Sequence, residues 1–252
     1  MSDSNKPAHE GARYWFIRSK KYDGLEWVHK RSLISAIIKA GEFEKDHLVL
    51  DVGTGTGAVA RSVSRFVREV IGIDKSAAMM KRGDWGENRY FVRRDIREPL
   101  FRDGVFDRIT ARMVFHHILE GTRGAMRECC RVLKKGGLMV LVEGVPPSEK
   151  VKEDFTEIFK LKEERLTFMG EDLVALMKGA GFKKTDIRYH VMRHMSVKNW
   201  LDKSGLPTAA VNKIYDMHRH ASPVFGKCYN MVITPDDCLI DMKMAIVVGE
   251  KQ

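Results

Sequence analysis

The sequence lacks the features that mark several large classes of protein. No run of about 18 or more apolar residues occurs, so no segment is long enough to cross a membrane as a helix. Residues 1–11 are polar and contain no apolar signal core, so we do not expect secretion. Only four cysteines are present, and they show no metal-ligand spacing: Cys129, Cys130, Cys228 and Cys238. We therefore expect a cytoplasmic protein with reduced thiols.

Charge is abundant but not clustered. Lys and Arg number 44 against 34 Asp and Glu, which gives a formal net charge of +10. Acids stand between the basic residues along the chain, and no run of five like charges and no aromatic-basic recognition motif occurs. This pattern favours a solvated basic surface over a nucleic-acid site. Attraction to an anionic substrate or to a membrane surface stays open.

A glycine-rich turn is the most informative feature that the chain does have. Residues 48–50 are apolar and predict a buried parallel strand, and residues 58–66 predict a helix. Between them, residues 51–57 contain an aspartate followed by three glycines at alternate positions. Glycines allow the backbone to turn tightly and to approach a ligand, at which free N–H groups then point. Strand, turn and helix together indicate a nucleotide-binding crossover.

The identity of the nucleotide depends on the segments that follow, because the glycine spacing also fits the dinucleotide fingerprint. The apolar run 70–73 ends in Asp74, and an acid at this place can accept both ribose hydroxyls of an adenosine. Such an acid serves NAD and S-adenosylmethionine equally. A third apolar run, 90–92, is followed by Arg93-Arg94-Asp95-Ile96, and this segment discriminates between the two.

Taken together, these segments resemble the class I S-adenosylmethionine-dependent methyltransferases, and within them the small-molecule enzymes related to the ubiquinone/menaquinone C-methyltransferases. Five motifs carry the resemblance in the family's order: Val49–Gly57, Gly72–Ser76 with Met79, Arg94–Ile96, Phe106–Ile109 and Leu133–Leu138. The resemblance implies an α/β fold, a Rossmann-like doubly wound seven-stranded sheet with an antiparallel last strand and an N-terminal helical lid. It places the last strand, residues 238–248, at the sheet edge beside the fifth strand.

The resemblance also implies which residues contact the cofactor. They are Asp51, Gly53, Thr54, Gly55, Gly57, Asp74, Lys75, Met79, Asp95, Ile96, Arg112 and Met113. In the family, Asp51 would help hold the amino-acid end of the cofactor, Met79 would lie against the adenine ring and Asp95 would accept from the adenine amino group. The residues alone also allow Asp51 to cap the turn, Met79 to fill a gap in the core and Asp95 to belong to a surface turn.

Aromatic residues before the core are candidates for the wall of the acceptor site. N-terminal segments of the resembling family often fold over the cofactor pocket, which implies this role for Tyr14, Trp15 and Tyr22; alternatively these residues pack the N-terminal helix. In the part of the chain where the resemblance is thinnest, His190 could reach over the pocket from the strand expected at residues 185–191.

His116 and His117 are the candidate catalytic residues, because they directly follow the fourth strand, expected within residues 105–115. A histidine with an ordinary pKa of about 6.5 suits proton removal from a phenol or enol, whereas a thiolate or an acidic ring carbon barely needs a base. The alternative interpretation is that the pair packs the start of the next helix. We expect no metal, because the ligand set of the metal-dependent catechol methyltransferases is not recognisable.

The chain divides, on this interpretation, into three parts. Residues 1–24 form an N-terminal tail and lid, and residues 25–147 form the S-adenosylmethionine-binding core, which ends at Pro146-Pro147. Residues 148–252 form the C-terminal half of the sheet with a helical, substrate-covering insertion. We expect helices at residues 25–40, 122–133, 149–164, 171–180, 196–204 and 208–220.

We predict an enzyme that methylates carbon or oxygen of a small molecule by in-line transfer, for which positioning is the main requirement. An RNA methyltransferase and a non-catalytic S-adenosylmethionine-binding protein are the alternatives. An NAD-dependent oxidoreductase is disfavoured by Arg94–Ile96 and Lys135–Gly137. The Asn/Asp-Pro-Pro-aromatic motif of DNA amino-methylating enzymes is absent, which argues against that chemistry. A homodimer is compatible with the sequence, which does not specify the acceptor.

Overall fold

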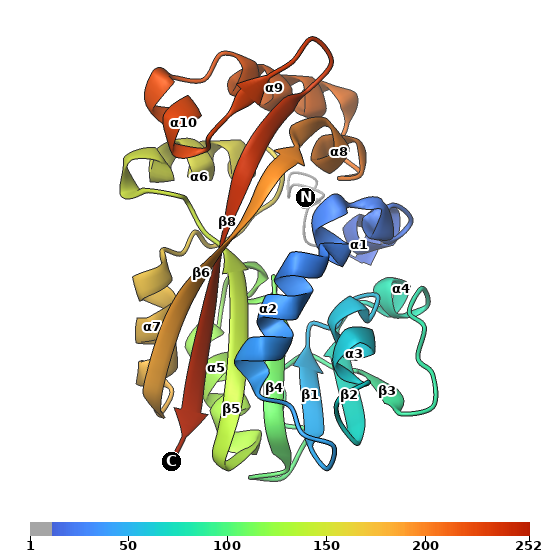
Figure 1. The fold of residues 1–252 in the computed structure, drawn as a ribbon. Helices are drawn as coiled ribbons and strands as arrows, with labels where there is room; N and C mark the ends of the chain where they lie inside the picture. The colour runs from blue at the N-terminus through green and yellow to red at the C-terminus, as the bar shows by residue number, and fades with distance from the viewer. Residues whose placement is uncertain (1–11) are drawn as a thin grey trace, which may run out of the picture.

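A mixed β-sheet runs through the protein in the computed structural model, which describes residues 12–252 (Figure 1). The N-terminal tail predicted at residues 1–11 lies outside this range. The strands are β1 (Leu48–Val52), β2 (Glu69–Asp74), β3 (Arg89–Arg93), β4 (Phe106–Arg112), β5 (Leu133–Gly144), β6 (Phe182–Ser196), β7 (Val232–Ile233) and β8 (Cys238–Lys251). They lie in the order β3-β2-β1-β4-β5-β8-β6, with the two-residue β7 paired to β8.

Strands β1 to β5 are parallel and β8 is antiparallel to both of its neighbours, β5 and β6. The predicted Rossmann-like α/β fold with an antiparallel last strand is thereby confirmed. The expected position of β8 at the sheet edge was wrong, because β6 is the edge strand. The residue pattern explains the difference. Residues 244–247 are all buried, as in an interior strand, whereas β6 exposes charged side chains such as Lys183 and Lys184.

Helices cover both faces of the sheet and one end of it. They are α1 (Ala12–Ser19), α2 (Arg31–Gly41), α3 (Ala58–Val63), α4 (Ala77–Met80), α5 (Thr122–Val132), α6 (Lys152–Lys160), α7 (Gly170–Gly179), α8 (Val197–Asp202), α9 (Thr208–Arg219) and α10 (Pro223–Cys228). Apolar residues of α5 and α7 form one core with the sheet, and apolar residues of α2 and α3 form a second. The described helices include none that is long and apolar enough to cross a membrane.

A third apolar core lies above the carboxyl ends of the parallel strands. It joins α6, α8, α9 and α10 to the end of β8 nearest to them (Figure 1). We call these four helices the cap. The cap and α1 approach the sheet from the same end, so the carboxyl ends of the strands lie beneath them (Figure 1). This arrangement places any ligand of the sheet between the strand ends, α1 and the cap.

Several element boundaries differ from the expected ones. The helix expected at residues 25–40 is interrupted at Lys30, whose extended backbone separates a 3₁₀ turn, Glu26–His29, from α2. The helix expected at residues 149–164 ends at Lys160, so residues 162–165 turn back toward the sheet instead of lying on a solvated helix. Helix α10 was not expected, although Ser222 followed by Pro223 is a typical helix start.

Candidate active site

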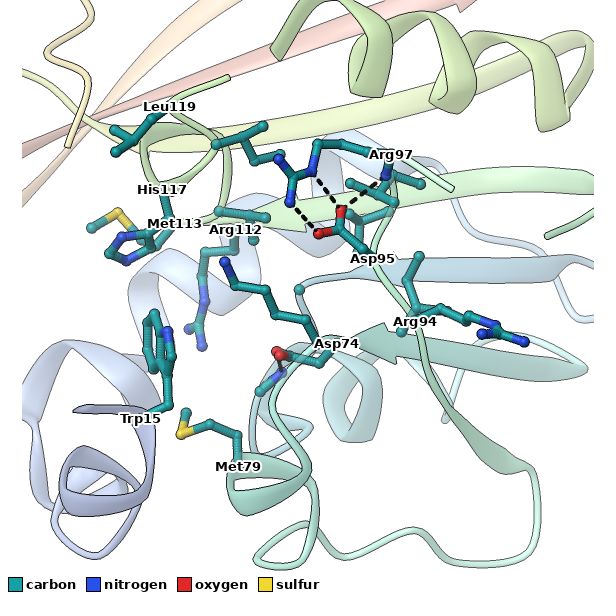
Figure 2. A pocket seen from close by; sticks show the side chains of 18 of the residues that line it. Trp15, Asp74, Met79, Arg94, Asp95, Arg97, Arg112, Met113, His117 and Leu119 are labelled. Carbon is teal, nitrogen blue, oxygen red and sulfur yellow. Dashed lines mark hydrogen bonds and ion pairs between the residues drawn. The ribbon is translucent and has the colours of Figure 1, made fainter. Parts of the chain in front are cut away.

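A cavity of about 430 Å³, which we call the main cavity, opens at the carboxyl ends of β1, β2 and β4 (Figure 2). The structure brings most of the residues predicted to contact the cofactor to its wall. They are Gly53, Gly55, Asp74, Lys75, Met79, Asp95, Ile96, Arg112 and Met113. The other three, Asp51, Thr54 and Gly57, do not line the cavity and instead stabilise the turn, as described below.

The glycine turn approaches the cavity with a backbone that few other residues could adopt. Gly53 and Gly55 have φ values of 62° and 58°, in the left-handed region where a Cβ is strained. A Cβ on Gly53 would lie 2.2 Å from Val114 Cγ2, and one on Gly55 would lie 3.3 Å from Met79 Cε. The turn therefore packs directly against the loop after β4 and against α4, and its glycine backbone faces the cavity. Gly57 begins α3 and packs against Trp85.

Asp51 holds the turn from within. Its two carboxylate oxygens accept hydrogen bonds from Thr54 Oγ1 at 2.6 Å and from Thr110 Oγ1 at 2.7 Å. Asp51 is 2% exposed, and burial raises the pKa of its carboxyl group. These hydroxyls tie the turn to β4, so the side chain of Asp51 has a structural role here.

Asp74 connects the glycine turn to the end of β2. Its Oδ2 accepts the N–H of Gly55 at 2.9 Å and its Oδ1 accepts the N–H of Ser76 at 2.8 Å. Burial raises the pKa of Asp74. Each carboxylate oxygen can accept a further hydrogen bond, because a carboxylate has about four lone-pair sites. Both oxygens of Asp74 can thus accept hydrogen bonds from a ligand in the cavity, in addition to those from the backbone.

Asp95 is paired with a residue that sequence reasoning did not single out. Arg97 donates from Nη2 to Oδ2 at 2.6 Å and from Nε to Oδ1 at 3.0 Å (Figure 2). Partial burial opposes ionisation of Asp95, but the hydrogen bonds from Arg97 outweigh it and hold the pKa of Asp95 below its usual value. The spacing Asp-x-Arg just after β3 was the sequence signal that could have predicted this pair.

Met113 directly follows β4 and lines the main cavity. Its φ of 58° is in the left-handed region, which is uncommon for a residue other than glycine. Its sulfur lies 3.2 Å from the N of Gly144. Before it, Arg112 donates from Nη1 to the carbonyl of Val28 at 2.8 Å, and its guanidinium lies 5.4 Å from the centre of the Trp27 ring.

Behind the main cavity is a second, smaller one of about 30 Å³, which we call the polar cavity. A buried network of charged side chains lines it, centred on Glu163. Glu163 Oε2 accepts from Lys162 Nζ at 2.5 Å, from Arg18 Nη1 at 2.7 Å and from Tyr14 Oη at 2.9 Å. Arg165 Nη1 lies 3.6 Å from Glu163 Oε1. All of these side chains are almost fully buried.

Burial and neighbouring charges set the ionisation of this network. Burial of Glu163 favours its neutral form, but Lys162 and Arg18 outweigh this effect and hold its pKa well below the usual value. Burial, reinforced by Arg18, lowers the pKa of Lys162 to about 7. The network therefore contains more buried cationic side chains than its carboxylate can balance.

The two candidate catalytic histidines occupy different positions. His116 is 1% exposed; its Nδ1 is 2.6 Å from Glu143 Oε2, and its ring faces the polar cavity. His117 lines both the polar cavity and the main cavity, and its ring lies 5.0 Å from that of Trp15. Burial lowers the pKa of both histidines well below the usual value, so both are neutral at pH 7.

Glu143 was missed by sequence reasoning, although it is a charged residue in the apolar run of β5. Its Oε1 accepts the N–H groups of Val114 and Phe115 at 3.0 and 2.7 Å, which fixes the loop that carries both histidines. A carboxylate at the end of a buried parallel strand was the signal that could have found it.

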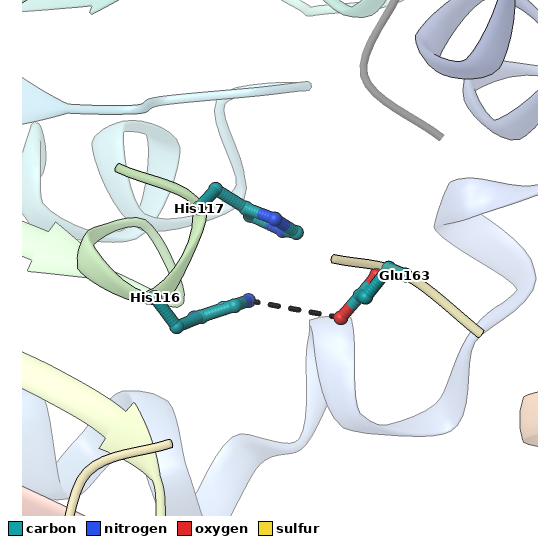
Figure 3. A group of neighbouring side chains, drawn as sticks. All are labelled: His116, His117 and Glu163. Carbon is teal, nitrogen blue, oxygen red and sulfur yellow. Dashed lines mark ion pairs between the residues drawn. The ribbon is translucent and has the colours of Figure 1, made fainter. Parts of the chain in front are cut away.

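The ligand atoms of His116, His117 and Glu163 lie within 4.8 Å of one another, which is close enough to consider a metal ion (Figure 3). The charges around them argue against a cation. Arg18 and Lys162 already donate to Glu163, and Arg165 lies beside its other oxygen. A divalent ion would add to this positive charge in a buried site, so the surroundings do not fit one.

The predicted acceptor residues are only partly brought together. Trp15 and Tyr22 line both the main and the polar cavity. Tyr14 lies behind them with its hydroxyl on Glu163. His190 is on the outer strand β6, where its Nε2 is 3.1 Å from Ser32 Oγ, and it lines none of these cavities.

Comparison with known proteins agrees with this geometry. A family model described as a methyltransferase domain matches residues 50–141, which carry the glycine turn, Asp74 and Asp95. Residues 50–141 are a methyltransferase domain. The chain is accordingly a methyltransferase, the class of enzyme that its motifs predict.

Three relatives illustrate the similarity. The uncharacterized methyltransferase YcgJ of Bacillus subtilis is 28% identical over 200 residues, which are 75% of this chain and 78% of that protein. Its crystal structure has a TM-score of 0.77 and covers 87% of this chain and 97% of that one. A demethylmenaquinone methyltransferase of Thermotoga maritima is 34% identical over 52% of this chain and 60% of its own length. The ubiquinone/menaquinone biosynthesis C-methyltransferase of Hahella chejuensis is 24% identical over 77% of this chain and 79% of its own length.

Proposed function

We propose that the protein transfers the methyl group of S-adenosylmethionine to a carbon or oxygen atom of a small molecule. The observation that carries the proposal is the main cavity. There the glycine turn, Asp74 and Met79 converge at the carboxyl ends of the parallel strands, directly beside the enclosed space beneath the cap. A volume of about 430 Å³ falls in the range that holds compact ligands. Relatives named for quinone and sterol methylation support a small acceptor.

The residues present fit the cofactor. Asp74 has unused acceptor capacity on both oxygens, which suits two ribose hydroxyls. Met79 and Ile96 supply apolar surface for the adenine ring, and Asp95 is held ionised beside them by Arg97. The backbone of Gly53 and Gly55 leaves room for the amino-acid end. When bound, S-adenosylmethionine supplies an electrophilic methyl group, and the remaining task of the chain is to position the acceptor and its proton.

We assign the removal of the acceptor's proton to His117. Its ring borders the main cavity and the polar cavity, so it lies between the cofactor and the space available to an acceptor. Because its pKa is well below the usual value, His117 is neutral at pH 7 and can accept a proton, but it is a weak base. It therefore suits an acidic acceptor hydroxyl. His116, held by Glu143, is a positioning residue for this loop.

The three-part organisation belongs to the same proposal. Helix α1 covers the main cavity through Trp15, residues 25–147 bind the cofactor, and the cap within residues 148–252 encloses the acceptor. The acceptor spaces are small and lie beneath helices, which suits a small molecule better than RNA.

Titration of the pure protein with S-adenosylhomocysteine tests the cofactor assignment. We expect binding that is lost in part when Asp74 is replaced by alanine. Tight binding of NAD with no binding of S-adenosylhomocysteine would contradict the proposal.

A further inference from the structure

Three cavities at the carboxyl ends of the strands and beneath the cap share lining residues. Met113 lines all of them. Trp15 and His117 separate the main cavity from the polar cavity. Phe159 and Trp200 separate the polar cavity from a third, of about 60 Å³, which we call the apolar cavity. A molecule that enters the polar cavity would thus have the cofactor space on one side and an apolar space on the other.

The polar cavity carries an excess of positive charge. Arg18, Lys162 and Arg165 line it, and their side chains are 6%, 2% and 3% exposed. Glu163 is the carboxylate within the same lining, and Glu143 lies behind His116, where two backbone N–H groups and the imidazole use its oxygens. Three buried cationic groups therefore share one carboxylate at the cavity wall.

Two donors in this wall have no acceptor. Among the residues that the structure describes, Arg18 Nε and Arg165 Nη2 are buried and have no hydrogen-bond partner. Buried polar groups are normally paired, and an unpaired one in a native protein requires an explanation. Both side chains line the polar cavity. Burial, together with the charge of Arg18, lowers the pKa of Lys162 in the same wall.

The surroundings of the cations are aromatic. Lys162 Nζ lies 5.3 Å from the centre of the Phe159 ring and 5.6 Å from that of the Trp200 ring. The guanidinium carbon of Arg165 lies 4.2 Å from the centre of the Phe159 ring. The apolar cavity beyond is lined by further rings, including Phe155, Phe225 and Tyr229. An acceptor that is anionic at one end and apolar or aromatic at the other matches the cationic polar cavity and the aromatic lining of the apolar cavity beside it.

We propose that the polar cavity binds an anionic oxygen group of the methyl acceptor, a carboxylate or an ionised phenol or enol, on Arg18, Lys162 and Arg165, while the apolar body of the acceptor occupies the apolar cavity. This inference rests on the proposed methyltransferase function and specifies the acceptor class. The anionic group fills the acceptor role that the two unpaired guanidinium donors lack. It lies next to His117, which takes the proton when a phenol or enol ionises in the site.

The experiment is titration calorimetry of the full chain saturated with S-adenosylhomocysteine. The carboxylate arm compares benzoate with uncharged benzamide. The phenolate arm compares 2,4-dinitrophenolate with its uncharged methyl ether. We expect the anion of at least one arm to bind about tenfold or more tightly than its neutral analogue, because charged hydrogen bonds in buried sites are worth about this much. The arm that responds identifies the kind of anion.

Three variants complete the test. Arg165→Gln and Lys162→Met should weaken binding of that anion about tenfold or more while their affinity for S-adenosylhomocysteine stays within about twofold of the parent. Lys162→Arg should retain most of the binding. Lys160→Met, which removes an exposed cation on α6, is the matched control and should change nothing.

A second readout is independent of affinity. If the anion stabilises the ammonium form of Lys162, its binding at pH 8 takes up a proton, which titrations in buffers of different ionisation enthalpy detect. Lys162→Met should abolish this uptake.

The inference is overturned if neither anion binds more tightly than its neutral analogue, or if Arg165→Gln and Lys162→Met bind the anion as the parent does. Failure of the parent to bind S-adenosylhomocysteine is a different result: it would overturn the proposed function itself. The two failures are therefore distinguished by the first titration.

Discussion

Replacing Lys162 by methionine tests the buried charge network through the pH dependence of stability. The pKa of Lys162 falls from 10.5 to about 7 in the folded protein because the ammonium is buried and faces Arg18. Between these values the unfolded chain binds more protons at this residue than the folded protein does. The contribution of Lys162 to the free energy of unfolding therefore rises with pH, is complete above about 10.5, and is lost as pH falls through about 7.

The magnitude follows from the same shift. One proton of difference changes the free energy of unfolding by about 1.4 kcal/mol per pH unit. Between pH 7 and pH 9, where the folded group is half to almost fully deprotonated, the expected gain is about 2 kcal/mol. Urea unfolding of the parent and of Lys162→Met at pH 7, 8 and 9 measures the gain as the difference between the two proteins. Titrating groups outside this network affect both proteins and cancel.

Lys160→Met is the control, because Lys160 is exposed and its ion pair with Glu157 lies at the surface. The stability difference between the parent and this variant should stay constant over the same pH range. If the free energy of unfolding of the parent relative to Lys162→Met is also constant, or if it falls as pH rises, then the pKa of Lys162 is not lowered in the folded protein and the reasoning is refuted.

Three further predictions concern the main cavity. Asp74→Ala should weaken binding of S-adenosylhomocysteine by about 1–3 kcal/mol, measured by calorimetry, because a buried hydroxyl pair loses its acceptor; an unchanged affinity would show that Asp74 does not bind ribose. Gly53→Ala should lower both the melting temperature and cofactor affinity, because its Cβ would lie 2.2 Å from Val114 Cγ2. Gly124→Ala, in α5 with no heavy atom within 4 Å of a new Cβ, is the matched control and should be neutral or stabilising. His117→Gln should reduce kcat about a hundredfold with an acidic acceptor and leave S-adenosylhomocysteine affinity unchanged; equal kcat would exclude His117 as the base.

The cofactor half was predictable because its signals are local. The glycine turn, Asp74 and Asp95 each stand at the end of a short apolar run, and parallel strands end at the same edge of a sheet. The doubly wound sheet with an antiparallel last strand followed from the resemblance, but the position expected for β8 at the sheet edge did not hold. There the decisive evidence was the uninterrupted burial of residues 244–247, which marks an interior strand.

The acceptor side was not predictable in the same way. Arg18 and Glu163 are 145 residues apart in the sequence and meet only because α1 folds beneath the cap. In sequence, Lys162 to Arg165 resembles the charged end of a solvated helix, and only the termination of α6 at Lys160 turns these side chains inward. His116 and His117 were located correctly at the end of β4, but their different orientations depend on Glu143, which reaches them from β5.

Incubation with methyl-labelled S-adenosylmethionine tests the central proposal most directly. The pure protein is mixed with the labelled cofactor and an extract of the cells that make it, and small molecules, RNA and protein are then separated. We predict that label appears in the small-molecule fraction, in a compound that is acidic and carries an apolar body, and that Asp74→Ala reduces the transfer. Label found in RNA alone, or no transfer by a protein that binds S-adenosylhomocysteine, would contradict the proposal.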